Sequence, residues 1–115
     1  MSAHRRSRAA VESKSSAPLF AALGDETRLR LVSRLCDAGP MSITRLTTGS
    51  KVTRQAITKH LRVMQAAGLV RGARRGRESV WQLDLRRLDD ARRYLDLISK
   101  QWDETLGRLR KFVED

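Results

Sequence analysis

Several residue types that support particular kinds of protein are scarce in this chain of 115 residues. Its one cysteine, Cys36, cannot form a disulfide within the chain, which is typical of a reducing compartment. The only histidines, His4 and His60, lie far from each other and from Cys36, so the sequence offers no ligand set for a transition metal. We therefore expect no metal site and no cofactor.

Long apolar runs are also missing. The longest run near the N-terminus, PLFAAL (18–23), is too short for a signal peptide or a membrane span. No segment combines a basic face with exposed Trp and Phe, as membrane-surface helices do. The sequence also lacks a nucleophile–base motif, a glycine-rich phosphate loop and an isolated carboxylate pair. We expect a cytoplasmic protein that binds no membrane and is not an enzyme.

Acidic residues are absent from the middle of the chain. Residues 38–77 contain nine Lys or Arg and no Asp or Glu, whereas residues 84–115 contain eight acids and eight bases. The net charge of +11 is therefore concentrated on the middle segment and on the N-terminal residues. Such an excess serves either solubility or a polyanionic partner, and its concentration in one segment favours the partner.

The order of the expected elements defines the fold. Residues 1–16 are polar and predict a flexible basic arm, and residues 17–115 form the folded domain. A short apolar helix ends at Gly24, and Asp25 caps a second helix that ends at Gly39. Ser42 caps a short third helix, and Thr53 caps a fourth that ends at 67–68. The side chains expected to point inward from the second helix are Leu29, Val32, Leu35 and Cys36.

A β-hairpin and a long helix complete the expected domain. LVRGA (69–73) and SVWQLD (79–84) flank RRGRE, whose Gly76 suits a turn. From Arg86 onward, apolar residues recur every three or four positions as a heptad stripe. Its members are Leu88, Ala91, Leu95, Ile98, Trp102, Thr105, Leu109 and Phe112. The sequence therefore predicts a mostly α fold with a small β-hairpin, a winged helix-turn-helix.

The fourth helix has two contrasting faces. Projection at the helical period places Ala56, Ile57, Leu61 and Met64 on one face and only polar or basic residues on the other. A solvated helix normally mixes both signs of charge, whereas this face carries side chains that reach DNA bases and phosphates. The predicted DNA-binding residues of this helix and its cap are Thr53, Arg54, Gln55, Thr58, Lys59 and Arg62.

The hairpin tip adds three arginines, Arg74, Arg75 and Arg77, within four residues. They form either a solvated turn or a wing that reaches the minor groove, and their clustering favours the wing.

His60, at the edge of the apolar face, is either a packed, hydrogen-bonded residue or a phosphate contact. Cys36 is either a redox sensor or a small buried hydrophobe, and we expect the latter.

Three segments together resemble the ArsR/SmtB family of bacterial transcription regulators: ALGDETRLRLVSRL (22–35), VTRQAITKHLRVMQAAGLV (52–70) and RRGRESVWQLD (74–84). The chain departs from the family pattern at Glu26, which replaces a proline, and at Arg54 and Gln55, at base-reading positions. The Cys-x-Cys cluster and the terminal His/Glu set of the family's metal sensors are absent. The resemblance thus points to a branch without metal ligands.

The resemblance implies a homodimeric repressor that binds duplex DNA at an inverted repeat, with the first and last helices forming the interface. The heptad stripe agrees, because it is too long for one side of a small core; an intramolecular role for it is the alternative. The predicted interface residues are Leu19, Phe20, Leu95, Ile98, Trp102 and Leu109. Two other classes stay open: a small basic RNA-binding structural protein and a winged-helix module for protein contacts.

Overall fold

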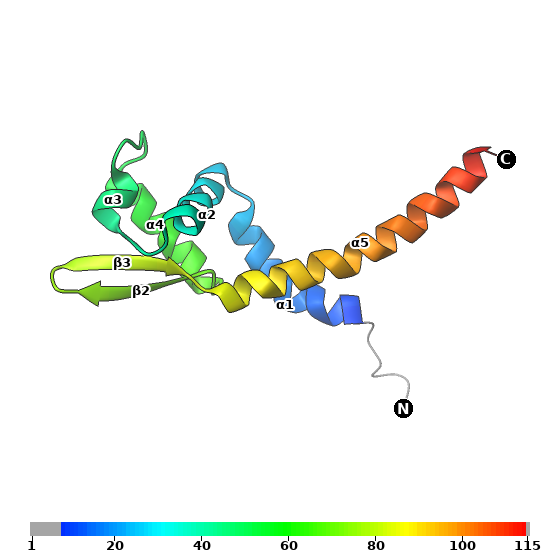
Figure 1. The fold of residues 1–115 in the computed structure, drawn as a ribbon, viewed down its shortest axis with the longest axis horizontal. Coiled ribbons are helices and arrows are strands. Elements are labelled where there is room, and N and C mark those ends of the chain that lie inside the picture. Colours follow the sequence, from blue (N-terminus) through cyan, green and yellow to red (C-terminus); the bar gives the residue numbers. More distant parts are fainter. Residues whose placement is uncertain (1–7, 115) are drawn as a thin grey trace, which may run out of the picture.

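The computed structural model describes residues 8–114, and its elements follow the predicted order (Figure 1). They are α1 (Arg8–Leu23), α2 (Glu26–Ala38), β1 (Met41–Ser42), α3 (Ile43–Thr47), α4 (Arg54–Ala66), β2 (Val70–Arg75), β3 (Glu78–Leu83) and α5 (Leu85–Glu114). The fold is mostly helical with a small antiparallel sheet, which confirms the predicted class. The sheet has three strands in the order β1-β3-β2. The two-residue strand β1 was not predicted, because its pairing with β3 depends on the tertiary structure.

Side-chain caps begin three of the helices where the sequence placed them. At each cap, a side-chain oxygen accepts a hydrogen bond from the backbone N–H three residues later. The caps are Asp25 for α2, Ser42 for α3 and Thr53 for α4. Gly39 ends α2 with a φ of 77°, a conformation that favours glycine. Local chemistry therefore sets the helix boundaries around the helix-turn-helix.

The N-cap of α2 gives a testable pH dependence. The backbone N–H of Arg28 and, more weakly, the charges of Arg28 and His60 hold the pKa of Asp25 below its ordinary value, partly opposed by desolvation. The carboxylate therefore contributes stability above its unfolded pKa, and this contribution is lost as the pH falls through the folded pKa. Asp25→Asn keeps a capping oxygen and removes the charge.

We expect the Asp25→Asn variant to unfold at lower urea concentration than the wild type at about pH 6. The difference in midpoint should shrink as the pH falls below 3.8, the ordinary pKa of an aspartate side chain. Urea unfolding followed by circular dichroism across this range measures it. A difference that stays constant down to about pH 2 would contradict the assigned role of the charge.

The core is formed by buried side chains of α1, α2, α3 and α4 together with Met41, Leu69, Val70 and Ala91, and Trp81 and Leu83 of β3 pack against it. The predicted apolar face of α4 is confirmed, because Ile57, Leu61 and Met64 are buried. The predicted face of α2 is partly wrong. This helix buries Leu31 and Leu35, whereas Leu29 is 52% exposed. Cys36 is exposed as well, so it is not the buried small hydrophobe that we expected. The buried side of α2 is centred on Leu31 and Leu35 and is therefore rotated from the predicted stripe.

Helix α1 begins at Arg8, so residues 8–16 are helical although the sequence assigned them to a flexible arm. Residues 1–7 lie outside the described part of the chain. Contacts with α5 and the core account for the longer helix. The guanidinium of Arg87 donates a hydrogen bond to the Ser15 carbonyl (2.7 Å), and Ser16 is buried. Tertiary contacts override the polar composition of this segment.

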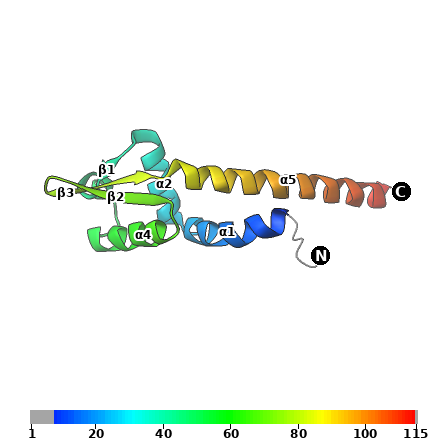
Figure 2. The ribbon, with the colours of Figure 1, turned by 90° about the horizontal axis from the view of Figure 1, so that it is seen from below.

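Helix α5 gives the molecule its elongated shape. The principal extents are 63 × 40 × 20 Å and the radius of gyration is 18.6 Å, against about 13 Å for a compact domain of this size. The first turns of α5 pack on α1 and the core through Leu88 and Ala91. The C-terminal part projects away from the rest of the fold (Figures 1 and 2). An isolated protomer therefore leaves much of this helix without a protein neighbour.

Candidate nucleic-acid interface

The polar face of α4 points outward. Its core side chains fix the helix on α2 and α3, and this leaves Arg54, Gln55, Lys59 and Arg62 exposed. Thr58 is half-buried, and its hydroxyl donates to the carbonyl oxygen of Arg54 (2.9 Å). Together these five residues line one shallow depression along the helix. The predicted side chains are therefore gathered on a single surface, with the exposed cap Thr53 at its N-terminal end.

The wing is the hairpin formed by β2 and β3. The two strands pair from Val70↔Leu83 to Arg75↔Glu78, which leaves Gly76 and Arg77 as the turn. Gly76 has a φ of 62° at the first turn position, as a type II′ hairpin turn requires. Arg74, Arg75 and Arg77 are all exposed at this tip. Figure 2 shows α4 and the wing extending in the same direction, away from the C-terminal end of α5.

A groove of about 290 Å³ separates α4 from the wing. Besides the predicted Arg54, Thr58 and Arg62, it is lined by Ile43, Gln65, Ser79 and Trp81. Gln65 was not among the predicted residues, although its spacing of three residues from Arg62 places it on the same helical face. Ser79 and Trp81 enter the groove only because of the hairpin's position, which the sequence pattern does not contain.

The Trp81 ring lies against Gly72 on the neighbouring strand. A Cβ atom at Gly72 would be 3.0 Å from the ring's Cζ3 atom, a contact so tight that the ring would have to shift. Gly72 therefore allows the indole to lie flat over β2, beside the groove. This packing fixes the base of the wing, since Trp81 also pairs with Met41 of β1.

Only some of the described basic residues form ion pairs. In the part of the chain that the structure describes, ion pairs engage Arg30, Arg71, Arg87 and Arg93 with acidic side chains. Within those same residues, no ion pair involves the predicted DNA-binding cations, namely Arg54, Lys59, Arg62, Arg74, Arg75 and Arg77. Their charges are exposed and uncompensated, which is the electrostatic arrangement that attracts a polyanion.

His60 links α4 to α2. Its Nδ1 atom lies 3.2 Å from Nη1 of Arg28 and 3.8 Å from a carboxylate oxygen of Asp25. The residue is half-buried, and Nε of Arg28 also donates to the Ala22 carbonyl. Of the two open alternatives, this geometry favours a packed, hydrogen-bonded histidine that orients the helix.

The predicted interface residues fall into two sets. Leu19 has no exposed surface, because it is part of the protomer's own core, so its assignment to an interface is corrected. Phe20 is half-buried and contacts Tyr94 with ring centroids 5.6 Å apart. Along α5, Ile98 is half-buried, and Leu95, Trp102 and Leu109 are 48%, 62% and 55% exposed. The apolar stripe is therefore largely uncovered.

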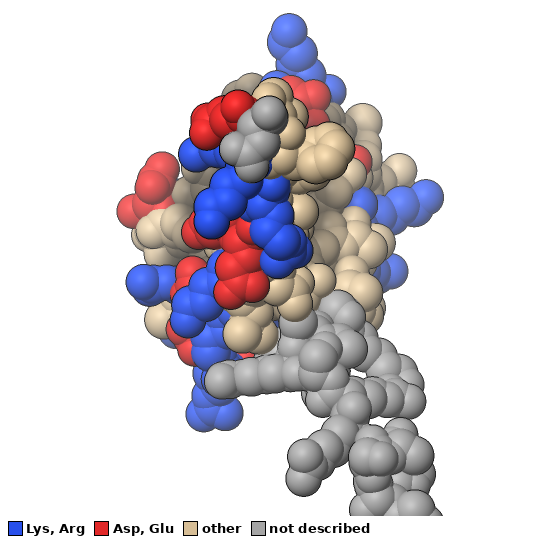
Figure 3. All heavy atoms as spheres, turned by 90° about the vertical axis from the view of Figure 1, so that its right-hand side faces the viewer, with Lys and Arg blue, Asp and Glu red and all other residues tan. Residues whose placement is uncertain are grey.

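Seen from the C-terminal end of α5, acidic and basic side chains alternate beside a surface without charge (Figure 3). Within residues 8–114, no helix combines the length and apolar character needed to cross a bilayer. Nor do His, Cys, Asp and Glu side chains of that range form a cluster of three able to hold a metal ion.

Comparisons with known proteins agree with this geometry. Residues 23–73 match a family model described as a helix-turn-helix domain. The chain is 39% identical over 93 residues to the HTH-type transcriptional regulator Rv2034 of Mycobacterium tuberculosis, covering 81% of this chain and 83% of that protein.

Solved structures extend the likeness to the whole fold. An ArsR-like transcriptional regulator from Rhodococcus sp. RHA1 is 37% identical with a TM-score of 0.71, covering 86% of this chain and 92% of that one. A homodimeric winged helix-turn-helix domain from Mycobacterium bovis, a possible ArsR-family regulator, has a TM-score of 0.63 and covers 92% and 94%. Its identity is 22%, so it supports the fold alone.

Proposed function

The chain belongs to the ArsR family of DNA-binding winged helix-turn-helix transcriptional regulators, and on that premise we propose that it is a homodimeric repressor of an inverted-repeat operator. Helix α4 reads bases in the major groove, the wing contacts the flanking minor groove, and α5 joins two protomers. Binding of the dimer blocks transcription from the promoter that contains the operator.

The uncompensated charge on α4 and the wing is the observation that carries this proposal. Arg54 and Gln55 are on the first turn of α4, from which side chains reach base edges. Lys59 and Arg62 follow on the same face and suit phosphate contacts. No acid lies in the first turn of α4, so its positive dipole end also favours a phosphate.

The exposed stripe on α5 supports the dimer. Large apolar side chains that are about half exposed in one protomer gain favourable burial when a second copy covers them. A two-fold axis along this stripe presents two α4 helices to successive major grooves, about 34–36 Å apart. An inverted repeat with half-sites at that spacing is the matching operator.

The aromatic residues argue against the RNA-binding alternative. Proteins that bind single-stranded RNA place exposed aromatic rings on the basic surface. Here Phe20 packs on Tyr94, and Trp81 lies over Gly72. The most exposed rings, Trp102 and Phe112, are on α5, away from the cations of α4 and the wing. The basic surface thus suits a duplex.

The salt dependence of binding tests the proposal directly. If a dimer makes roughly six to ten phosphate contacts, log K against log salt should have a slope of about −5 to −9 on duplex DNA. Fluorescence anisotropy with duplex DNA, duplex RNA and single-stranded DNA measures the slope and the preference. Binding that does not depend on salt, or equal affinity for duplex RNA, would refute the proposed recognition of operator DNA.

The two basic elements should differ in what they recognise. Gln55→Ala should relax preference at particular operator positions and cost about 1–3 kcal/mol on the best site. Arg75→Ala or Arg77→Ala should instead weaken binding to many sequences alike, or reduce an A/T preference at the flanks. Selection from a random duplex pool with each variant separates these effects. Wing variants that change the central bases, with an unchanged profile for Gln55→Ala, would reverse the proposed docking.

A further inference from the structure

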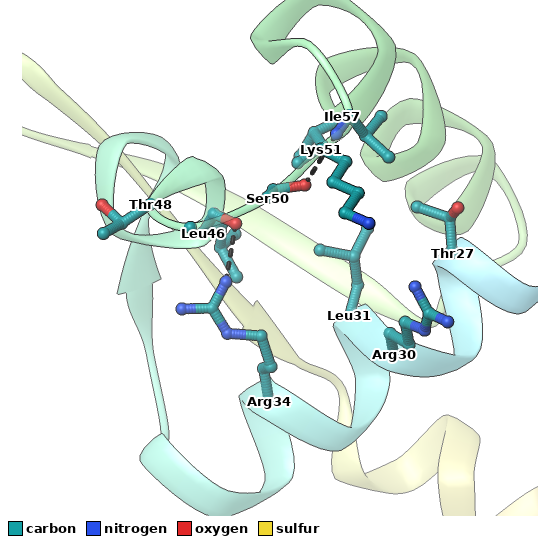
Figure 4. Close-up of a pocket in the computed structure, with 11 residues that line it drawn as sticks. Thr27, Arg30, Leu31, Arg34, Leu46, Thr48, Ser50, Lys51 and Ile57 are labelled. Atoms are coloured by element: carbon teal, nitrogen blue, oxygen red, sulfur yellow. Dashed lines mark hydrogen bonds between the residues drawn. The ribbon is translucent and has the colours of Figure 1, made fainter.

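A cleft with a cationic rim, which contains none of the predicted DNA-binding residues, lies between α2 and the turn that joins α3 to α4 (Figure 4). Its volume is about 470 Å³. Thr27, Arg30 and Arg34 come from α2, and Thr48, Gly49, Ser50 and Lys51 come from the turn. A cleft of this size accommodates a small organic molecule.

The floor of the cleft is apolar. Leu31, Leu46 and Ile57 are nearly fully buried, and they come from α2, α3 and α4 in turn. Half-buried Val52 closes one side. A DNA phosphate is bound by hydrogen-bond donors that protrude from the surface, so a recessed apolar floor would add nothing to its affinity. A ligand with an apolar body would cover it and gain hydrophobic stabilisation.

The rim of the cleft is cationic, and no acidic residue lines it. Arg30 forms an exposed ion pair with Glu26, which is weak in water. Lys51 is exposed and, like Arg34, has no ion pair among the described residues. An anionic group placed above the apolar floor would therefore meet uncompensated positive charge on two sides.

Arg34 connects the cleft to the DNA-binding unit. Its guanidinium donates hydrogen bonds to the carbonyl oxygens of Leu46 (2.6 Å) and Arg45 (2.9 Å), at the end of α3. These bonds hold the α3–α4 turn against α2. A carboxylate is a stronger acceptor than a backbone carbonyl, so an anion that pairs with Arg34 draws its guanidinium away from these carbonyl oxygens. Its binding would release the turn that sets the position of α4.

We propose that this cleft binds a small organic anion with an apolar body, such as an aromatic carboxylate, and that binding of the anion lowers the affinity of α4 for DNA. This regulation rests on the proposed function. By linkage, operator DNA lowers the affinity for the anion by the same factor by which the anion lowers the affinity for DNA. Coupling of this kind typically amounts to roughly five- to 150-fold.

The first test measures occupancy on the DNA-free protein with a matched pair of probes. Sodium 2-naphthoate and neutral 2-naphthalenemethanol share one ring system and differ in charge. In ¹H–¹⁵N spectra, naphthoate should shift amides of residues 27–34 and 46–57, and the alcohol should bind at least about fivefold more weakly. Equal binding of the two probes, or shifts confined to α5, would overturn the site.

Substitutions test whether the residues at the rim of the cleft bind naphthoate. Lys51→Gln should weaken naphthoate by about five- to tenfold, and Thr27→Trp should block it by filling the cleft. Lys100→Gln removes an equally exposed charge from α5 and should change nothing. If Lys51→Gln leaves naphthoate binding intact and instead lowers the salt slope for DNA, Lys51 is a phosphate contact and the proposal is wrong.

The second test measures coupling. Titration of duplex DNA should show weaker binding in sodium naphthoate than in sodium chloride at equal ionic strength, and Thr27→Trp should abolish the difference. Naphthoate that fills the cleft without changing DNA affinity overturns the regulatory role. Absence of DNA binding even without naphthoate refutes the proposed function instead, and the spectra still report on the cleft.

Discussion

Replacing Arg54, Lys59 and Arg62 together with alanine is expected to reduce operator affinity by at least about a thousandfold. A dimer loses six cationic contacts, each worth about 1–3 kcal/mol where it meets a base or a phosphate in good geometry. All three side chains are exposed and form no ion pair among the described residues, so no intramolecular partner is left unsatisfied.

Stability should be almost unchanged in this variant. Exposed substitutions away from caps and core contacts alter unfolding by about half a kcal/mol or less, and alanine is the best helix former. Thermal unfolding beside the anisotropy titration separates the two effects. A variant that melts like the wild type and has lost DNA binding identifies the face of α4 as the contact surface.

A matched control distinguishes local contacts from net charge. Arg86, Lys100 and Lys111 are exposed on α5 and lie off its apolar stripe. Replacing these three with alanine removes the same total charge at a distance from α4. The control should bind the operator within a few-fold of the wild type, apart from slower electrostatic steering. Equal losses in both triple variants would show that only the overall charge matters.

Local signals in the sequence predicted the helix caps, the hairpin turn and the two faces of α4. The caps at Asp25, Ser42 and Thr53 and the turn at Gly76 depend on chemistry within a few residues, and the structure has each of them. The two faces of α4 also follow from helical periodicity, since its buried and exposed residues alternate with a strong period.

The predictions from sequence were wrong where tertiary contacts determine the secondary structure or the burial of a side chain. Strand β1 exists because Met41 and Ser42 meet β3, and two residues carry no strand pattern of their own. The start of α1 depends on packing against α5, with Arg87 reaching Ser15 across 72 positions of sequence. Leu29 shares the apolar character of Leu31, and only the placement of the neighbouring elements determines which one is buried.

The predicted dimer surface shows the same distinction between local pattern and tertiary contact. The heptad period predicted a continuous apolar stripe on α5, and much of it is exposed on the protomer. The corresponding expectation for α1 was wrong at Leu19, because a short apolar segment next to a core becomes part of that core. The spacing of apolar residues along a helix identifies its apolar face. What covers that face depends on how the elements pack together.

Replacing Trp102 and Leu109 with glutamate should convert the protein into folded monomers that no longer bind the operator specifically. Their side chains are 62% and 55% exposed, so the protomer loses little packing. Four apolar side chains leave the dimer interface, each worth about 1.5–3 kcal/mol on burial. Four like charges would also face each other across the two-fold axis. Sedimentation velocity should show a single monomeric species.

The proposed DNA-binding surface on α4 and the wing is unchanged in this variant, so the result isolates the role of dimerisation. In a dimer, binding of one half-site makes the second contact intramolecular, which raises the overall affinity by roughly 10²–10⁴. Monomers lose that gain and should retain only weak, salt-sensitive binding through α4 and the wing. Lys100→Glu changes the net charge equally on the polar side of α5 and should remain dimeric. A folded monomer that still binds the full inverted repeat with wild-type affinity would refute the dimer mechanism, because each half-site would then be recognised without its partner.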